Sequence, residues 1–214
     1  SPYEFVPVSG PHLIWGVDLH NDGCEELGDC DAKGRGKLRW LHLNLANHGT
    51  REWIEQSSEL PKPVRQLLLS SEMHQQAIVE KNVVGLVLHD YERDFDQADT
   101  ARIGALRVAI APKLIVTARL HPLRSADIMR RRLLDAENIG SSAAALDILV
   151  GSIVEDISQI TRQLTYEVQA TEDALFEERA SPSSRDLMSI RRRLVQVHRM
   201  LTGMTATFTR LDED

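Results

Sequence analysis

The stretch that decides the architecture is residues 187–211, which read LMSIRRRLVQVHRMLTGMTATFTRL. Its apolar side chains recur at alternating steps of three and four residues, the a/d heptad pattern of a helix that lies along another helix. The members of this heptad seam are Leu187, Ile190, Leu194, Val197, Leu201, Met204, Phe208 and Leu211. The acidic ending Leu-Asp-Glu-Asp is a poor helix terminus, because acidic side chains are disfavoured at the negative end of the helix dipole. We therefore expect a piece cut within a long helical stalk.

A second long helix is expected just before this one, over residues 142–179. Its apolar positions, from Leu149 to Val168, follow a spacing closer to an 11-residue repeat than to a heptad, which predicts a nearly straight helix. Residues 180–184, ASPSS, form a tight break with serines suited to cap the next helix. At about 1.5 Å per residue the arms are roughly 57 Å and at least about 45 Å long. They are predicted to form an antiparallel hairpin that projects from the preceding domain or lies along a partner.

The charges of the two arms are complementary. Residues 142–180 carry eight acidic and two basic side chains, whereas residues 185–210 carry six arginines and one aspartate. Exposed ion pairs contribute only a few tenths of a kcal/mol each, so the charges select the pairing of the arms more than they stabilise it. Arg191, Arg192 and Arg193 are interpreted as partners of the acidic arm. The alternative is a ring of positive charge around a cation path.

The first 140 residues read as a mixed α/β domain. Strand patterns lie at 12–19, 38–45, on either side of a turn at 81–82, at 106–111 and at 113–120. Short helices are expected at 50–58, at 61–69, and from Ser125, as the cap, to about Gly140. In the strand 38–45 both parities carry apolar side chains, which indicates burial on both faces. The predicted fold is α+β: an α/β/α sandwich with a mixed sheet over residues 1–140, then a long antiparallel two-helix stalk over residues 141–214.

Composition narrows the possible functions. The 214 residues carry a net charge of −7, which argues against general nucleic-acid binding. No apolar run approaches the roughly 20 residues of a membrane span. Cys24 and Cys30 are separated by five intervening residues and form no CxxC motif, and a reduced pair is favoured over a loop disulfide. No nucleophile elbow, P-loop, dinucleotide or HExxH motif is present, so no enzyme and no cofactor are expected.

Several histidines and acids are candidate metal ligands. Asp18 and His20 share one face of a strand, but a polar strand end explains them more simply. Glu72 and His74 stand together after a helix, and His198 could form a ring of imidazoles in a symmetric oligomer. For both sites the alternative is an ordinary surface position.

Two further groups are interpreted as structural. His42 has apolar neighbours on both sides and is expected to be a half-buried residue of the sheet. Arg130, Arg131 and Arg132 are expected to form a solvated helix face.

These segments together resemble the CorA superfamily of divalent-cation transporters, in its ZntB-like branch. The resemblance covers about residues 12–214 as an ordered pattern, without one diagnostic motif. It rests on Trp40–Asn44, Leu60–Leu68, Val83–His89, Leu106–Arg119, Leu146–Leu149, the Ser/Pro break and the arginine-rich heptad helix. The Gly-Met-Asn signature of the superfamily follows its first membrane helix, beyond residue 214.

The resemblance implies a cytoplasmic domain at the inner (plasma) membrane, of which five copies form a funnel. The last helix would continue into the first membrane span, and the ion would be zinc or magnesium. CorA-type channels place regulatory acids in an early short helix and at the start of the stalk helix. Asp186 fits the second place, whereas the first holds Leu67, with only Glu72 nearby. This departure disfavours magnesium gating of the CorA type.

The predicted function is the cytoplasmic funnel domain of a divalent-cation transporter that forms a homo-oligomer, a pentamer in the full-length protein. The alternative is a soluble coiled-coil scaffold or signalling module without a role in transport.

Overall fold

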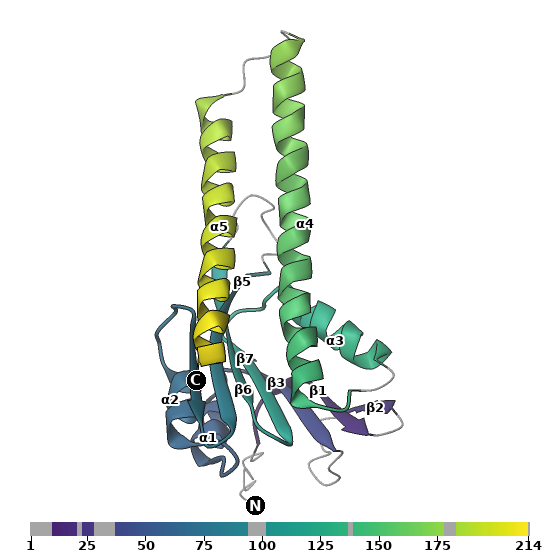
Figure 1. Cartoon of the computed structure of the whole chain (residues 1–214), viewed down its shortest axis with the longest axis vertical. Helices are drawn as coiled ribbons and strands as arrows, with labels where there is room; N and C mark the ends of the chain where they lie inside the picture. Colours follow the sequence, from purple (N-terminus) through teal and green to yellow (C-terminus); the bar gives the residue numbers. More distant parts are fainter. Residues whose placement is uncertain are drawn as a thin grey trace, which may run out of the picture.

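The computed structural model describes residues 10–20, 23–27, 37–93, 102–136, 139–177 and 183–213, except for the side chains of residues 184 and 185. Two long antiparallel helices, α4 (Ser142–Phe176) and α5 (Ser184–Glu213), extend from a mixed α/β domain (Figure 1). The predicted hairpin is confirmed. Of its predicted break at residues 180–184, residues 180–182 lie outside the described residues.

One mixed sheet organises the domain. Its strands are β1 (Leu13–His20), β2 (Gly23–Glu26), β3 (Leu38–Asn44), β4 (Gln76–Glu80), β5 (Val83–Tyr91), β6 (Ile103–Ile110) and β7 (Leu114–Arg119). Their spatial order is β2-β1-β3-β7-β6-β5-β4. β3 and β7 run parallel, and the other neighbouring strands run antiparallel. The predicted mixed sheet is therefore confirmed.

The turn predicted at residues 81–82 is present between β4 and β5. Lys81 and Asn82 have φ angles of 50° and 64°. Two successive residues with positive φ are typical of the two-residue type I′ turn, whose twist matches that of antiparallel strands. This turn fixes the register in which Glu80 lies opposite Val83.

The sheet is buried on both faces. On one face, Leu41, Leu43 and Leu45 share a core with α1 (His48–Gln56) and α2 (Lys62–Leu69). On the other face, Leu38 and Trp40 share a core with α3 (Ser125–Asp135), α4 and α5. The two parities of β3 thus serve two different cores, as its sequence predicts. The α/β/α layers are confirmed.

Helix α4 anchors the hairpin to the second core. Its residues Leu149, Ile153, Ile157, Ile160 and Leu164 are all buried in the same cluster as strand residues of β5 and β6. Helix α5 contributes Val197, Met200 and Met204 to this cluster. Fully burying one large aliphatic side chain contributes about 1.5–3 kcal/mol. The buried residues of α4 and α5 together therefore hold the base of the hairpin firmly on the sheet. The boundary at residues 140/141 between domain and stalk stays a prediction.

Three local expectations are corrected. The sequence patterns place no strand between residues 19 and 38, yet the edge strand β2 lies there and pairs with β1. Helix α1 begins at His48 and is capped by Asn47, whose Oδ1 accepts from the Thr50 amide at 3.3 Å. Helix α3 ends at Asp135, and Ser125 lies within the helix rather than at the cap. In short polar segments the sequence pattern does not specify where an element begins or ends, and contacts with the rest of the fold decide it.

Candidate functional site

The face of α5 that packs on the domain is only partly the predicted heptad seam. The buried positions of the helix are Arg193, Val197, Met200, Met204 and Thr207. Val197 and Met204 belong to the seam, whereas the others lie beside it. The hairpin therefore uses a face rotated away from the centre of the seam.

The other half of the seam is open in this structure. Leu187, Leu194 and Leu201 are 47%, 45% and 37% exposed, and Met188 and Val195 beside them are exposed as well. We call these five residues the open α5 face. A helix whose apolar stripe is wider than its intramolecular contact is suited to pack against a second helix.

Toward its C-terminal end, next to the open α5 face, the helix carries several small side chains on its surface. An open groove of about 530 Å³ is lined by Leu201, Thr202, Thr205, Ala206, Thr209, Arg210 and Glu213. The hydroxyls of Thr202, Thr205 and Thr209 donate to carbonyls of their own helix, each at 2.9 Å. Because these hydroxyls are already bonded, this surface can approach an apolar neighbour without leaving donors unpaired.

The two arms are joined by an ion pair between opposite charges. Arg193 Nη1 donates to Glu167 Oε1 at 3.1 Å and to Oε2 at 2.8 Å. The Arg193 side chain is largely buried, whereas Arg191 and Arg192 are exposed. The interpretation of the arginine triplet as partners of the acidic arm is thus confirmed for Arg193.

We expect the Arg193–Glu167 pair to contribute about 1 kcal/mol of coupling to the free energy of unfolding, because it is half-buried and doubly hydrogen-bonded. A double-mutant cycle with Arg193→Met and Glu167→Gln, followed by urea denaturation, measures this coupling. The matched cycle with Arg192→Met should give no coupling. Equal values for the two cycles would contradict this assignment.

The predicted metal ligands are not gathered into one site. Glu72 Oε2 and His74 Nδ1 lie 3.6 Å apart, and both side chains are exposed. Asp186 is in the first turn of α5, where its amide donates to Ser183 Oγ at 3.2 Å and its carboxylate accepts from the same hydroxyl at 2.6 Å. His198 is exposed on α5. Within the described ranges, no group of three or more His, Cys, Asp or Glu side chains could hold a metal ion.

The structure gives Asp18, His20 and His42 other surroundings. Asp18 is buried and receives both Nε and Nη2 of Arg39 at 2.7 Å, so it is a structural partner of an arginine. His20 is exposed, with Nε2 3.7 Å from Glu25. His42 is fully buried rather than half-buried.

His42 belongs to an aromatic cluster in the sheet. Its ring stacks on Trp15 at a centroid distance of 5.0 Å, and Nδ1 is hydrogen-bonded to Thr117 Oγ1 at 2.8 Å. Trp40 Nε1 donates to the same hydroxyl at 3.1 Å. Burial, and secondarily the charge of Arg119, lower the pKa of His42 to about 3. A neutral imidazole in this position stabilises the core and is not available to a metal.

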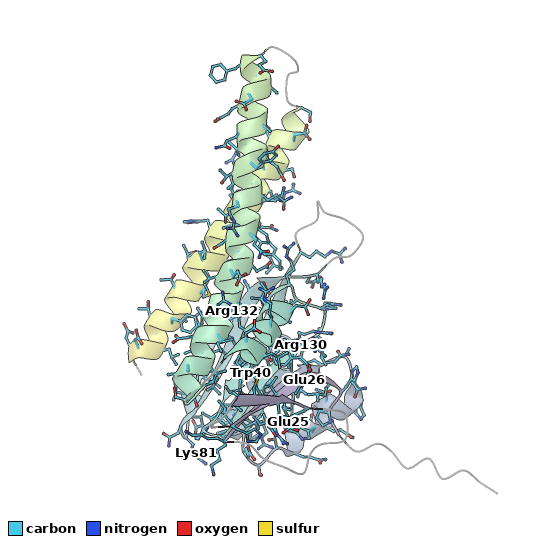
Figure 2. The ribbon with its side chains drawn as sticks, turned by 90° about the vertical axis from the view of Figure 1, so that its right-hand side faces the viewer. Glu25, Glu26, Trp40, Lys81, Arg130 and Arg132 are labelled. Carbon is cyan, nitrogen blue, oxygen red and sulfur yellow. The ribbon has the colours of Figure 1, made fainter. Side chains whose placement is uncertain are left out.

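The expectation of a solvated arginine face on α3 is confirmed for Arg130 and Arg131, which are exposed, whereas Arg132 is partly buried. Arg130 pairs with Glu26 of β2, and Arg131 and Arg132 both approach Glu155 of α4. Figure 2 shows Arg130 and Glu26 close together at the edge of the domain. These arginines therefore bridge α3 to two neighbouring elements. Cys24 of β2 is a free thiol, while Cys30 lies outside the described residues.

One contact that the sequence analysis missed joins the edge of the sheet to α5. Gln75 Nε2 donates to the Met200 carbonyl at 3.1 Å, and Gln75 Oε1 accepts from the His89 amide at 3.2 Å. A Cβ atom at Gly203 would collide with Gln75 Nε2. A glycine inside a helix costs stability unless close packing requires it. Gly203 was therefore the sequence signal for a close contact at this position of α5.

The mixed α/β/α domain with its long hairpin is the fold of CorA and ZntB soluble domains. Full-length CmaX superposes with a TM-score of 0.81 at 19% identity, covering 94% of this chain and 64% of that one. The crystal structure of the ZntB cytoplasmic domain from Vibrio parahaemolyticus RIMD 2210633 superposes with a TM-score of 0.75 at 14% identity, covering 95% and 80%. At these identities the likeness establishes the fold.

Sequence comparison establishes the family. The family model described as CorA-like Mg2+ transporter protein matches residues 35–214, so the chain belongs to this family. Zinc transport protein ZntB of Pectobacterium carotovorum subsp. carotovorum (strain PC1) is 23% identical over 189 residues, which are 88% of this chain and 57% of that protein. The predicted resemblance is confirmed, and the family consists of transporters rather than enzymes. Among the described helices, none has the length and apolarity needed to cross a bilayer.

Proposed function

We propose that the full-length protein is a divalent-cation transporter of the inner membrane and that this chain is its cytoplasmic funnel domain. The single observation that carries the proposal is the open α5 face in a chain of the CorA-like family. Helix α5 would continue into the first membrane span, and conformational changes of the domain would reach the pore through it. The acidic composition of the chain, with a net charge of −7, would attract cations toward the funnel.

The transporter would be a homo-oligomer, and we propose a pentamer. The open α5 face supplies the apolar contact, since Leu187, Leu194 and Leu201 recur every seven residues along one side of the helix. The small side chains around Thr205 allow the helices to approach closely farther along α5.

The transported ion would be zinc or magnesium. The family description names Mg2+, while the Pectobacterium relative is named as a zinc transport protein. Glu72 and His74 offer a carboxylate and an imidazole, ligands that suit zinc, but they are only two. We propose that further ligands come from a neighbouring copy, and that Asp186 and His198 contribute to sites of the same kind between copies.

Flux measurements test this function directly. Full-length protein in liposomes loaded with a fluorescent indicator should admit Zn2+ or Mg2+, whereas protein-free liposomes should not. His74→Ala should reduce the flux of the admitted ion if the proposed contact takes part. An assembled oligomer that moves neither ion would refute the transport function and favour the scaffold alternative.

The open α5 face also predicts self-association of the 214-residue chain. We expect Leu194→Asp combined with Leu201→Asp to lower the association constant at least about 100-fold, because two charges would be buried in the contact. Sedimentation velocity over a concentration series measures this change. Tyr166→Asp, at an exposed position on α4, is the matched control and should associate as the unmodified chain does. Unchanged association of the double variant would exclude this face as the interface.

A further inference from the structure

Two buried carboxylates lie where the end of β5 meets α3 and α4. Asp90 of β5 is 0% exposed, and Asp156 of α4 is 1% exposed. Burying a charge without a matching partner is costly, so each buried carboxylate requires an account of its partners.

Asp90 is held by donors from two elements. Its Oδ2 accepts from the Ser125 amide at 2.9 Å and from the Ser125 hydroxyl, and its Oδ1 accepts from the Tyr91 amide at 2.8 Å. Helix α3 has no side-chain cap of its own, because Arg124 occupies the cap position. Asp90 therefore caps α3 from the sheet and joins β5 to this helix.

Asp156 is only half satisfied. Its Oδ1 accepts from Arg124 Nε at 2.9 Å, while its Oδ2 is buried and has no hydrogen-bond partner among the described residues. The hydroxyl of Tyr91 is buried in the same condition. An unpaired buried acceptor costs about 1–3 kcal/mol, so the α4 side of this cluster has one hydrogen-bonding position unfilled.

Charged groups from every surrounding element act on the cluster. Helix α3 supplies Arg124, α4 supplies Asp156, and the charge of Arg193 on α5 acts on Tyr91. Arg193 is already bonded to Glu167. Of the two buried carboxylates, only Asp156 is directly paired with a guanidinium, that of Arg124.

Electrostatics agree with this geometry. Burial raises the pKa of Asp90 and the charge of Asp156 adds to the rise, while the hydrogen bonds from Ser125 and Tyr91 oppose it, and the net result is a pKa of about 7. Burial, followed by the charge of Asp156, raises the pKa of Tyr91 to about 12. Asp90 therefore changes its charge near neutral pH.

We propose that Asp90 and Asp156 form a proton-sensitive joint between the sheet and α4, closed when Asp90 is protonated and loosened when both carboxylates are charged. The protonated acid can donate to Ser125 Oγ while its other oxygen still accepts from the Tyr91 amide. Loss of the proton leaves two like charges in one buried cluster in which only Asp156 is paired with an arginine, and the repulsion is relieved by opening the contact of α4 with β5. The joint is a property of this chain and goes beyond the proposed transport function, whatever the full-length protein carries.

Hydrogen exchange of the 214-residue chain tests the joint. Backbone amides of residues 149–160 on α4 are followed by mass spectrometry at pH 6 and pH 8, with rates corrected for intrinsic exchange. We expect about tenfold more protection at pH 6, since a group with a pKa near 7 when closed and near 3.8 when open shifts the opening equilibrium by this factor. Asp90→Asn should remove the difference between the two pH values.

Two controls isolate the effect. Asp147→Asn removes an exposed carboxylate from the same helix and should keep the tenfold difference. His89→Gln removes the neighbouring titratable ring, which is bonded to the Met73 carbonyl, and should keep it as well.

A carboxyl-carbon NMR titration of the unmodified chain is independent of whether Asp90→Asn folds. It should show Asp90 titrating near pH 7. A midpoint below 5, or equal protection of α4 at pH 6 and pH 8, would overturn the proposal.

Discussion

Arg107→Ala is expected to lower the free energy of unfolding by about 3–5 kcal/mol, one of the largest effects of any single substitution in this chain. Arg107 is 2% exposed on β6, where Nη1 donates to the Leu67 carbonyl at 3.0 Å and Nη2 to the Glu72 carbonyl at 2.7 Å. These carbonyls belong to the end of α2 and the segment that follows it. Removing the guanidinium leaves both acceptors unpaired and a cavity behind. Burial, and then the nearby Arg51, lower the pKa of Arg107, yet the arginine remains charged.

Chemical denaturation of a short series tests this account of Arg107. Arg107→Met restores packing without donors and should recover less than half of the loss, while Arg107→Lys, which can reach one carbonyl, should recover more than Met. Arg102→Ala, at an exposed position just before β6, should change the free energy by less than about 0.5 kcal/mol. If the Arg107→Met variant were as stable as the unmodified chain, the contacts of Arg107 with the two carbonyls would contribute nothing to stability.

The second large effect is acid destabilisation through His42. Its pKa is about 3 in the folded chain and 6.5 when unfolded, so the unfolded state binds more protons between these values. The contribution of His42 to stability is complete above pH 6.5 and is lost as the pH falls toward 3. The loss amounts to about 3 kcal/mol by pH 4.5.

Asp90 works in the opposite direction. Its pKa rises from 3.8 to about 7 on folding, so its contribution is present below pH 3.8 and is lost as the pH rises through 7. Between about pH 4 and 6.5 the two groups nearly cancel, and the unmodified chain should show a flat stability profile. Removing either group should therefore uncover the dependence of the other.

His42→Phe keeps a ring against Trp15 but cannot be protonated. The unmodified chain should lose about 3 kcal/mol more unfolding free energy than this variant when the pH falls from 7 to 4.5. Urea titrations at each pH measure it. His198→Phe, at an exposed histidine, should run parallel to the unmodified chain. Parallel curves for His42→Phe would show that His42 does not titrate differently in the two states.

The packing of α4 and the charge of Asp90 together suggest how the stalk is held. The apolar residues of α4 supply the bulk of the contact with the sheet, while the carboxylates at Asp90 and Asp156 make that contact sensitive to protons. In the proposed transporter, a change at this joint would act on α4 and, through the Arg193–Glu167 pair, on α5. The open α5 face would pass the change to neighbouring copies.

Part of the site could be predicted because it follows from local spacing. The arginine triplet of α5 lies opposite an acidic arm, and any antiparallel hairpin brings some of these charges together, as Arg193 and Glu167 show. The partners of buried polar groups were not predictable in this way. Asp18 is held by Arg39, 21 residues away, and Asp90 by Ser125, 35 residues away. Nothing in the neighbouring sequence distinguishes such an acid from an exposed one.

The sequence by itself determined the hairpin, the two-sided strand β3 and the β4–β5 turn, because heptad spacing, side-chain parity and turn residues act within a few positions of the chain. Only the tertiary structure decided which half of the α5 heptad seam is buried: Val197 and Met204 face the domain, and Leu194 and Leu201 remain exposed. Helical periodicity indicates that the apolar stripe of α5 packs against something, but it does not indicate which element packs there. The domain behind α5 can cover only one side of a stripe this wide, and the remainder stays exposed.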